Sequence, residues 1–215
     1  MLRIYCINLD RRADRWAECQ ANYQSQGLSP AAVQRVSAVE DADFGALGCA
    51  KSHVFALSRF LTQESVPYCL IVEDDFDLVR PFSELVDCFN RLASERVDWD
   101  ALLLMGTSVI ASPRQEPGIA RVIEAQSAAG YLVSRRYAPA LLACFAESIP
   151  LLETLRGIQP RHFAVSRLAT DQAWKRLQRR DRWYIFTPTI GRQRPSFSDI
   201  EQRDVNYDAE TYGMA

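Results

Sequence analysis

The sequence predicts an α/β fold with a largely parallel central sheet, and three observations lead to this class. The apolar run 68–72 lacks polar alternation, so it is expected to form a strand buried on both faces, as in parallel sheets. Other apolar runs of strand length follow the same pattern, the clearest at 2–9 and 100–105. Segments with apolar residues at helical spacing separate these runs, and such alternation is typical of α/β proteins.

The first strand–helix unit is expected over residues 2–27. The strand 2–9 is followed by Asp10, a favourable helix N-cap, and Gly27 is a favourable helix stop. Three residues at helical spacing carry the helix: Trp16, Cys19 and Tyr23.

Polar residues follow this first strand at the sheet edge where ligands bind in open α/β folds. Asn8 leaves the strand there, and Arg11, Arg12 and Arg15 occupy the start of the helix. Arginine matches phosphate or carboxylate geometry, which suggests an anionic ligand. The alternative is that these arginines are surface charges of an amphipathic helix.

A second strand is expected at 33–39, followed by a loop at 40–48 and a helix that opens at 48–53. Ser52 and His53 would then lie on the first helical turn, where free backbone N–H groups favour anions. His53 is either a catalytic group or a capping residue with a structural role.

The acidic end of the run 68–72 is the strongest functional signal. Glu73, Asp74 and Asp75 follow the strand directly, and Asp77 comes two residues later. Adjacent carboxylates repel one another and are tolerated where they bind a cation or face water. A divalent metal site and a solvated strand end that caps the next helix both remain open at this point.

The remaining elements alternate in the same way within one domain, 1–215. A helix is expected after Pro81, a loop at 112–118, and strands at 121–124, 128–134 and 184–187. Ser134 and Thr170 are expected to cap two later helices, the second over 171–180. The tail 188–215 is polar.

Composition narrows the class of protein. The chain has 215 residues and a net charge of −2, so no global basic field for nucleic acid exists. No Gly-x-Gly-x-x-Gly or P-loop motif occurs. The six cysteines are scattered, without a C-x-x-C pair or a histidine at metal spacing, which favours reduced core residues.

The expected location is the cytoplasm. We find no signal-peptide pattern and no apolar run near the ~20 residues that span a bilayer. The segment 156–194 holds ten Lys or Arg against two Asp, which suits an anionic ligand or peripheral contact with the inner membrane face. A solvated basic surface is the alternative.

Several motifs in order resemble glycosyltransferase family 25, the lipooligosaccharide and collagen β-galactosyltransferase-like enzymes. The resemblance covers most of 2–145. It rests on these stretches: Asn8-Leu9, Asp14-Arg15, Gly48-Cys49 with Ser52-His53, the run from Leu70 to Asp75, and the run from Gly130 to Ser134. It continues weakly through Asp171, Pro188 and Ser196-x-Ser198-x-Ile200. The family Glu before Gly-Cys is missing, because Ala46 and Leu47 stand there.

The resemblance implies a GT-A-like fold, with a nucleotide-binding half at about 1–110 and an acceptor-side half at about 111–215. It implies inverting transfer of a hexose, galactose or glucose, from a UDP-hexose or similar donor to a saccharide or lipid-linked oligosaccharide acceptor, in lipopolysaccharide or other surface glycan synthesis. Mn²⁺ or Mg²⁺ would be held by Asp75 with Glu73, or by Asp77 in the other register. The implied substrate-binding residues are Asn8, Arg15, Ser52, His53, Glu73, Asp74, Gly130 and Tyr131.

An inverting transferase also needs a general base for the acceptor hydroxyl. The resemblance makes Asp171 the first candidate, with His53 and Asp77 in reserve. The missing family Glu raises the alternative of a weak or inactive nucleotide-sugar-binding protein of the same fold.

Two other classes of protein can be compared with the sequence. In a receiver-like signalling domain, 70–75 would be the acidic strand and 99–104 the phosphoacceptor strand, but Met105 stands where the acceptor Asp is needed. A two-metal nuclease or phosphatase would need a second, separated carboxylate set, which is not evident.

Overall fold

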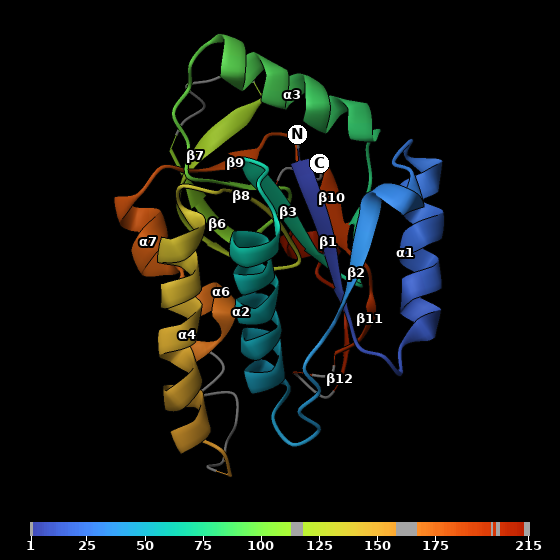
Figure 1. Ribbon diagram of the computed structural model, residues 1–215, viewed down its shortest axis with the longest axis vertical. Coiled ribbons are helices and arrows are strands. Elements are labelled where there is room, and N and C mark those ends of the chain that lie inside the picture. The colour runs from blue at the N-terminus through green and yellow to red at the C-terminus, as the bar shows by residue number, and fades with distance from the viewer. Residues whose placement is uncertain (1, 113–117, 158–166, 199, 201–202, 213–215) are drawn as a thin grey trace.

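The computed structural model describes residues 2–112, 118–157, 167–198, 200 and 203–212. Eight strands form one sheet in the order β2-β1-β3-β8-β5-β9-β7-β6, with helices on both faces (Figure 1). The strands of this sheet are β1 (Leu2–Asn8), β2 (Val33–Ser37), β3 (Tyr68–Glu73), β5 (Ala101–Leu103), β6 (Thr107–Ala111), β7 (Ile119–Gln126), β8 (Gly130–Ser134) and β9 (Trp183–Phe186).

Six of the eight strands run in the same direction, so the sheet is mostly parallel, as predicted. Strand β1 pairs in parallel with β2 and β3, and β5 pairs in parallel with β9, whereas β8 and β7 run against their neighbours. Strand β8, from the second half of the chain, lies between β3 and β5 from the first half. The two expected halves therefore share one sheet. A receiver domain is ruled out, because its acidic and phosphoacceptor strands belong to an all-parallel sheet.

Helices α2 (Gly45–Gln63) and α4 (Ala138–Thr154) pack together on one face, with the short helices α6 (Thr170–Ala173) and α7 (Lys175–Arg180) (Figure 1). Helices α1 (Ala13–Ser25) and α3 (Phe82–Ser94) cover the other. Alternate residues of β1 serve the two faces: Tyr5 packs in the α2–α4 layer and Cys6 in the α1–α3 layer. Both-face burial explains the unbroken apolar runs.

Two short strand pairings complete the described part of the chain. Strand β4 (Phe76–Leu78) pairs with β10 (Gly191–Gln193), and β11 (Ser196–Ser198) pairs with β12 (Arg203–Val205). Two 3-10 turns, Pro30–Ala32 and Asp208–Glu210, lie before β2 and after β12. The tail expected only to be polar therefore returns to the acidic strand end. No helix among the described residues is long and apolar enough to cross a membrane.

Four predicted helix starts need correction. Ser134 is not the cap of α4, whose N-cap is Tyr137, although the Ser134 hydroxyl accepts a hydrogen bond from the Tyr137 N–H at 3.3 Å. Helix α2 begins at Gly45, so Ser52 and His53 lie about two turns inside it and offer no free N–H groups. Asp10 does not cap α1 and instead binds Arg35 at 2.6 Å. Thr170 is the first residue of α6, not its cap, and the helix expected over 171–180 is divided at Trp174. Most of the loop expected at 112–118 lies outside the described residues.

Candidate functional site

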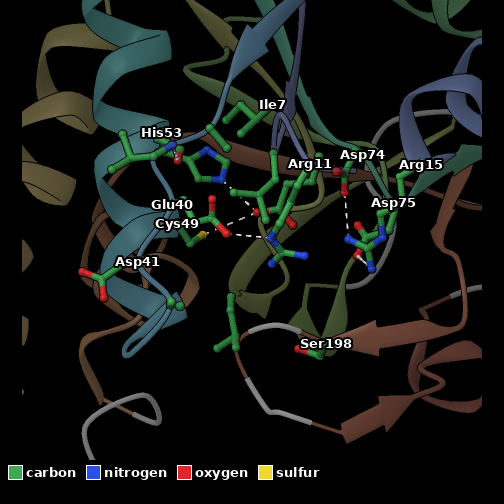
Figure 2. A pocket seen from close by; sticks show the side chains of 18 of the residues that line it. Ile7, Arg11, Arg15, Glu40, Asp41, Cys49, His53, Asp74, Asp75 and Ser198 are labelled. Carbon is green, nitrogen blue, oxygen red and sulfur yellow. Dashed lines mark hydrogen bonds and ion pairs between the residues drawn. The ribbon is translucent and has the colours of Figure 1, made fainter. Parts of the chain in front are cut away.

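A cavity of about 400 Å³ opens at the carboxyl ends of β1, β2 and β3. This is the sheet edge where open α/β proteins bind ligands, and the volume suits a small-molecule site. Figure 2 shows Cys49 and His53 projecting from α2 on one side, and Asp74 and Asp75 with Arg15 on the other. The residues that line the cavity include Arg15, Cys49, His53, Glu73, Asp75 and Gln193.

Glu73, the last residue of β3, meets two side chains of α2. His53 Nε2 lies 3.0 Å from Glu73 Oε1, and Cys49 Sγ lies 3.5 Å from the same oxygen. Although burial opposes ionisation, the hydrogen bond and charge of His53 bring the pKa of Glu73 below its usual value. Glu73 is therefore an ionised group with one oxygen committed to the α2 side chains.

Asp74 turns away from Glu73 towards α1. Its carboxylate accepts hydrogen bonds from Asn8 Nδ2 at 2.7 Å and from Arg15 Nη1 at 2.8 Å. Burial raises the pKa of Asp74, and Arg15 and Asn8 counter that effect. Asn8 and Arg15 therefore hold Asp74, although Arg15 and Asp74 also line the cavity.

Asp75 is the carboxylate with an unsatisfied atom. Its Oδ1 is buried and has no hydrogen-bond partner among the described residues, while Oδ2 accepts a bond from Gln193 Nε2 at 3.2 Å. Burial, followed by the charge of Glu73, raises the pKa of Asp75 to about 7, although Arg15 lies 3.7 Å away. A buried oxygen without a partner costs free energy unless a ligand satisfies it.

Asp77 is not brought to the cavity. It lies in β4, where its carboxylate accepts a hydrogen bond from Arg194 Nη1 at 3.1 Å and lies 3.9 Å from Arg192. Arg194 also donates to the carbonyl of Asp74, so this contact secures the turn that presents Asp74 and Asp75. Of the two metal registers predicted, the geometry favours Asp75.

Asp171 is connected to the cavity through two residues. Its Oδ2 accepts a hydrogen bond from the backbone N–H of Ser127 at 3.0 Å, and the Ser127 hydroxyl donates to Gln193 Oε1 at 3.3 Å. Burial raises the pKa of Asp171. Asp171 does not itself line the cavity.

His53, the reserve base, is fully buried, and both its ring nitrogens have partners, Glu73 and Tyr131.

Three predicted substrate-binding residues, Ser52, Gly130 and Tyr131, make structural contacts, and of these Ser52 also lines the cavity. The Ser52 hydroxyl donates to the Gly48 carbonyl and accepts from the Val39 N–H, which ties α2 to the loop after β2. Tyr131 is fully buried, and its hydroxyl lies 2.9 Å from His53 Nδ1. A Cβ on Gly130 would lie 2.6 Å from the ring of Phe76. Tyr131 and Gly130 do not line the cavity.

The basic segment 156–194 carries less free charge than its composition suggests. Several of its arginines pair with carboxylates from elsewhere in the chain: Arg156 with Asp41, Arg176 with Glu147, Arg179 with Glu124, and Arg182 with Asp98 and Asp100. Residues 158–166 lie outside the described part of the chain. The pairing favours a surface of internal ion pairs over a dedicated anionic docking site.

Sequence reasoning did not place Cys49 or Gln193 among the candidate site residues, although both line the cavity. Cys49 and His53 are four residues apart on one helix, so their side chains share a face, and the statement that no histidine lies at metal spacing was wrong. That spacing was a usable signal. Gln193 offered no such signal in the sequence. It reaches Asp75 only because β4 pairs with β10, and these two strands are more than a hundred residues apart in the chain.

Comparisons with known proteins show the fold. No protein-family model and no curated protein matches the chain. The crystal structure of mannose-1-phosphate geranyltransferase from Thermus thermophilus matches with a TM-score of 0.50 and 9% identity, over 86% of this chain and 73% of that chain. This likeness confirms the predicted GT-A-like α/β class. The resemblance to family 25 remains a prediction.

Two further structures match at lower TM-scores. UDP-glucose pyrophosphorylase complexed with UDP-glucose has a TM-score of 0.45 and 9% identity, over 86% of this chain and 72% of that chain. A glycosyltransferase involved in glycosylation of the major capsid of PBCV-1 has a TM-score of 0.40 and 8% identity, over 86% of this chain and 91% of that chain.

Proposed function

We propose that this protein is an inverting glycosyltransferase that moves a hexose, galactose or glucose, from a nucleoside-diphosphate sugar to a saccharide acceptor. One observation carries the proposal: the buried Oδ1 of Asp75 has no partner among the described residues and belongs to a cavity-lining residue at the ligand-binding edge of a GT-A-like sheet. The family 25 motifs support this class of substrate, and the similar structure of mannose-1-phosphate geranyltransferase supports the fold.

Asp75 fits a hard divalent cation, Mn²⁺ or Mg²⁺. The orphaned carboxylate oxygen is the kind of ligand that these ions prefer, and Mg²⁺ is commonly held by one or two carboxylates together with substrate phosphates. When bound, such an ion acts as a Lewis acid on the diphosphate leaving group. Glu73, whose Oε1 faces His53 and Cys49, is left to contact the ribose or sugar rather than to share this ion.

The chain's own residues hold this arrangement in place. Arg15 binds Asp74, Ser196 Oγ and the carbonyl of Phe197, and its guanidinium keeps a fixed positive charge 3.7 Å from Asp75. Gln193, in strand β10, orients Asp75 by donating a hydrogen bond from its Nε2 to Asp75 Oδ2. Preorganised charge of this kind favours a leaving group that gains negative charge.

Asp171 is the proposed general base. Its raised pKa suits a carboxylate that must accept a proton, and the hydrogen bond from the Ser127 N–H fixes one of its oxygens.

A catalytically weak nucleotide-sugar-binding protein is the second candidate. It is favoured by the absence of Asp171 from the residues that line the cavity.

Donor binding and turnover, measured in parallel with Mn²⁺ or EDTA and a panel of UDP-hexoses, test the proposal. Asp75→Asn should lose metal-dependent donor binding and transfer, whereas Asp77→Asn, the matched carboxylate two residues along, should keep both. Asp171→Asn should lower turnover about 10²–10⁴-fold with donor affinity unchanged.

The outcomes separate the candidates. Near-normal transfer by Asp75→Asn would remove that residue from the site. Metal-dependent donor binding by the wild type without transfer to any saccharide acceptor would favour the second candidate. Collapse of donor binding in Asp171→Asn would show that the base assignment is wrong.

The acceptor in this proposal is a saccharide or lipid-linked oligosaccharide of surface glycan synthesis, reached from the cytoplasmic face of a membrane. Because many arginines of 156–194 are already paired, the segment should give only weak attraction to an anionic acceptor. Acceptor affinity should therefore fall little between low and high salt.

A further inference from the structure

Three donor atoms of different chemistry converge beside the cavity: Cys49 Sγ, His53 Nε2 and Glu73 Oε1 all lie within 4.8 Å of one another. We propose that these residues form a binding site for a transition-metal ion, with Zn²⁺ as the best fit, distinct from the hard-cation position at Asp75. The proposal rests on the geometry of this triad. It shares Glu73 with the glycosyl-transfer proposal but does not depend on that proposal.

The spacing of the donors matches a tetrahedral ion. Ligands at the usual zinc distances of about 2.0–2.3 Å in tetrahedral geometry lie roughly 3.3–3.6 Å apart. The Cys49 Sγ–Glu73 Oε1 separation is 3.5 Å, and the His53 Nε2–Glu73 Oε1 separation is 3.0 Å. The Cys49 Sγ–His53 Nε2 separation is within 4.8 Å, so the side chains would close around an ion by moving towards one another.

The backbone and neighbouring side chains hold the donors in position. Cys49 and His53 stand four residues apart on α2, which places both on one helix face, and Glu73 ends the adjoining strand β3. His53 Nδ1 lies 2.9 Å from the hydroxyl of buried Tyr131. When Nδ1–H donates to this oxygen, Nε2 presents its lone pair to the site, which is the outer-shell arrangement common around zinc-bound histidine.

The donor set selects the class of metal. Thiolate and imidazole ligands favour zinc and its neighbours, whereas Mg²⁺ and Mn²⁺ prefer oxygen. Binding requires the thiolate form, so the Cys49 proton is released to solvent when the metal enters. The three protein ligands leave a fourth position, and Cys49 and Glu73 both line the cavity, so water or an anionic ligand atom can occupy it.

Cobalt binding tests the site directly, because Co²⁺ in place of Zn²⁺ gives a thiolate charge-transfer absorption band only where a thiolate coordinates it. The purified chain of residues 1–215 is stripped with EDTA and titrated with Co²⁺, and the bound Co²⁺ is then displaced with Zn²⁺. One equivalent should give the thiolate–cobalt band, and Zn²⁺ should abolish it. Cys49→Ser should lose the band and bind Zn²⁺ at least about 100-fold more weakly.

Two control variants make the result specific. Cys88→Ser, at a buried cysteine of α3 on the other face of the sheet, should keep the band. Asp75→Asn should keep it as well, even if Mn²⁺-dependent donor binding is lost, which separates this site from the proposed catalytic metal. Thermal unfolding confirms that each variant is folded.

A folded wild-type chain without the band would overturn the proposal and leave a metal-free His53–Glu73 ion pair beside a neutral thiol. Retention of the band in folded Cys49→Ser would overturn it too, because another cysteine would then be the ligand.

Discussion

Removing the Arg15 side chain should destabilise the protein much more than removing a neighbouring arginine does. Arg15 Nη1 lies 2.8 Å from Asp74 Oδ1, and the two side chains are only 8% and 9% exposed. Breaking a buried ion pair from one side leaves an uncompensated charge and costs about 3–5 kcal/mol. Arg15→Met should therefore lower the free energy of unfolding by about that amount at neutral pH.

Arg11→Met is the matched control. Arg11 pairs with Glu40 at 2.6 Å, but these side chains are 47% and 51% exposed, so the pair is screened by solvent and the loss should stay below about 1 kcal/mol. Comparing Arg15→Met with Arg11→Met therefore tests whether the burial of an ion pair, rather than its mere presence, determines the loss of stability.

A double-mutant cycle assigns the effect to the pair. Asp74→Asn removes the carboxylate, so adding it to Arg15→Met removes the unpaired charge. The double variant should lose at least about 1 kcal/mol less than the sum of the two single losses. Urea unfolding followed by circular dichroism gives all four free energies. Strict additivity, or an Arg15→Met loss no larger than that of Arg11→Met, would refute the reasoning.

Two other predictions concern packing and pH. Gly130→Ala places a Cβ 2.6 Å from the Phe76 ring and should cost about 1–3 kcal/mol in urea unfolding; a loss near zero would mean that the ring moves freely. The Asp181 carboxylate is held by Arg180, and it accepts a hydrogen bond from the Tyr137 hydroxyl at 2.6 Å; together they lower its pKa despite its burial. Its stabilisation should be present above about pH 4 and vanish as pH falls through the lowered folded-state pKa. Asp181→Asn should therefore cost about 1 kcal/mol at pH 6, and the difference from wild type should shrink as pH falls below about 4. A difference that does not change with pH would contradict this.

Local sequence pattern predicted inner strands of the sheet, such as β3 and β8, because they are apolar on both faces. It missed the edge strand β6, where Ser108 and Ile110 are exposed. Strand β3 and its acidic end stand where the run 68–75 placed them. The start of α2 was misplaced because the Asp and Gly residues around Ala46 and Leu47 indicated a loop, although Ala and Leu are themselves good helix formers. They become helical where Leu47 packs with Phe44 and Leu152, a contact that only the tertiary structure creates.

The candidate site was predicted where its residues follow one another and missed where they are distant. Glu73, Asp74 and Asp75 share one turn, but their separate partners, His53, Arg15 and Gln193, come from three different elements. The three-residue strands β10 and β11 are too short and polar to show a period-2 pattern. The sequence therefore indicated a cluster of carboxylates, and only the fold distinguishes the three roles.

Thermal unfolding with UDP-hexoses, in the presence of Mn²⁺ or EDTA, tests the central claim about Asp75 most directly. A ligand at 100 times its dissociation constant stabilises a protein by about 2.7 kcal/mol. We predict that at least one UDP-hexose stabilises the wild type by about this amount with Mn²⁺ and much less with EDTA, and that Asp75→Asn shows no difference between the two conditions. Equal stabilisation of wild type and Asp75→Asn by the same donor and metal would contradict the claim.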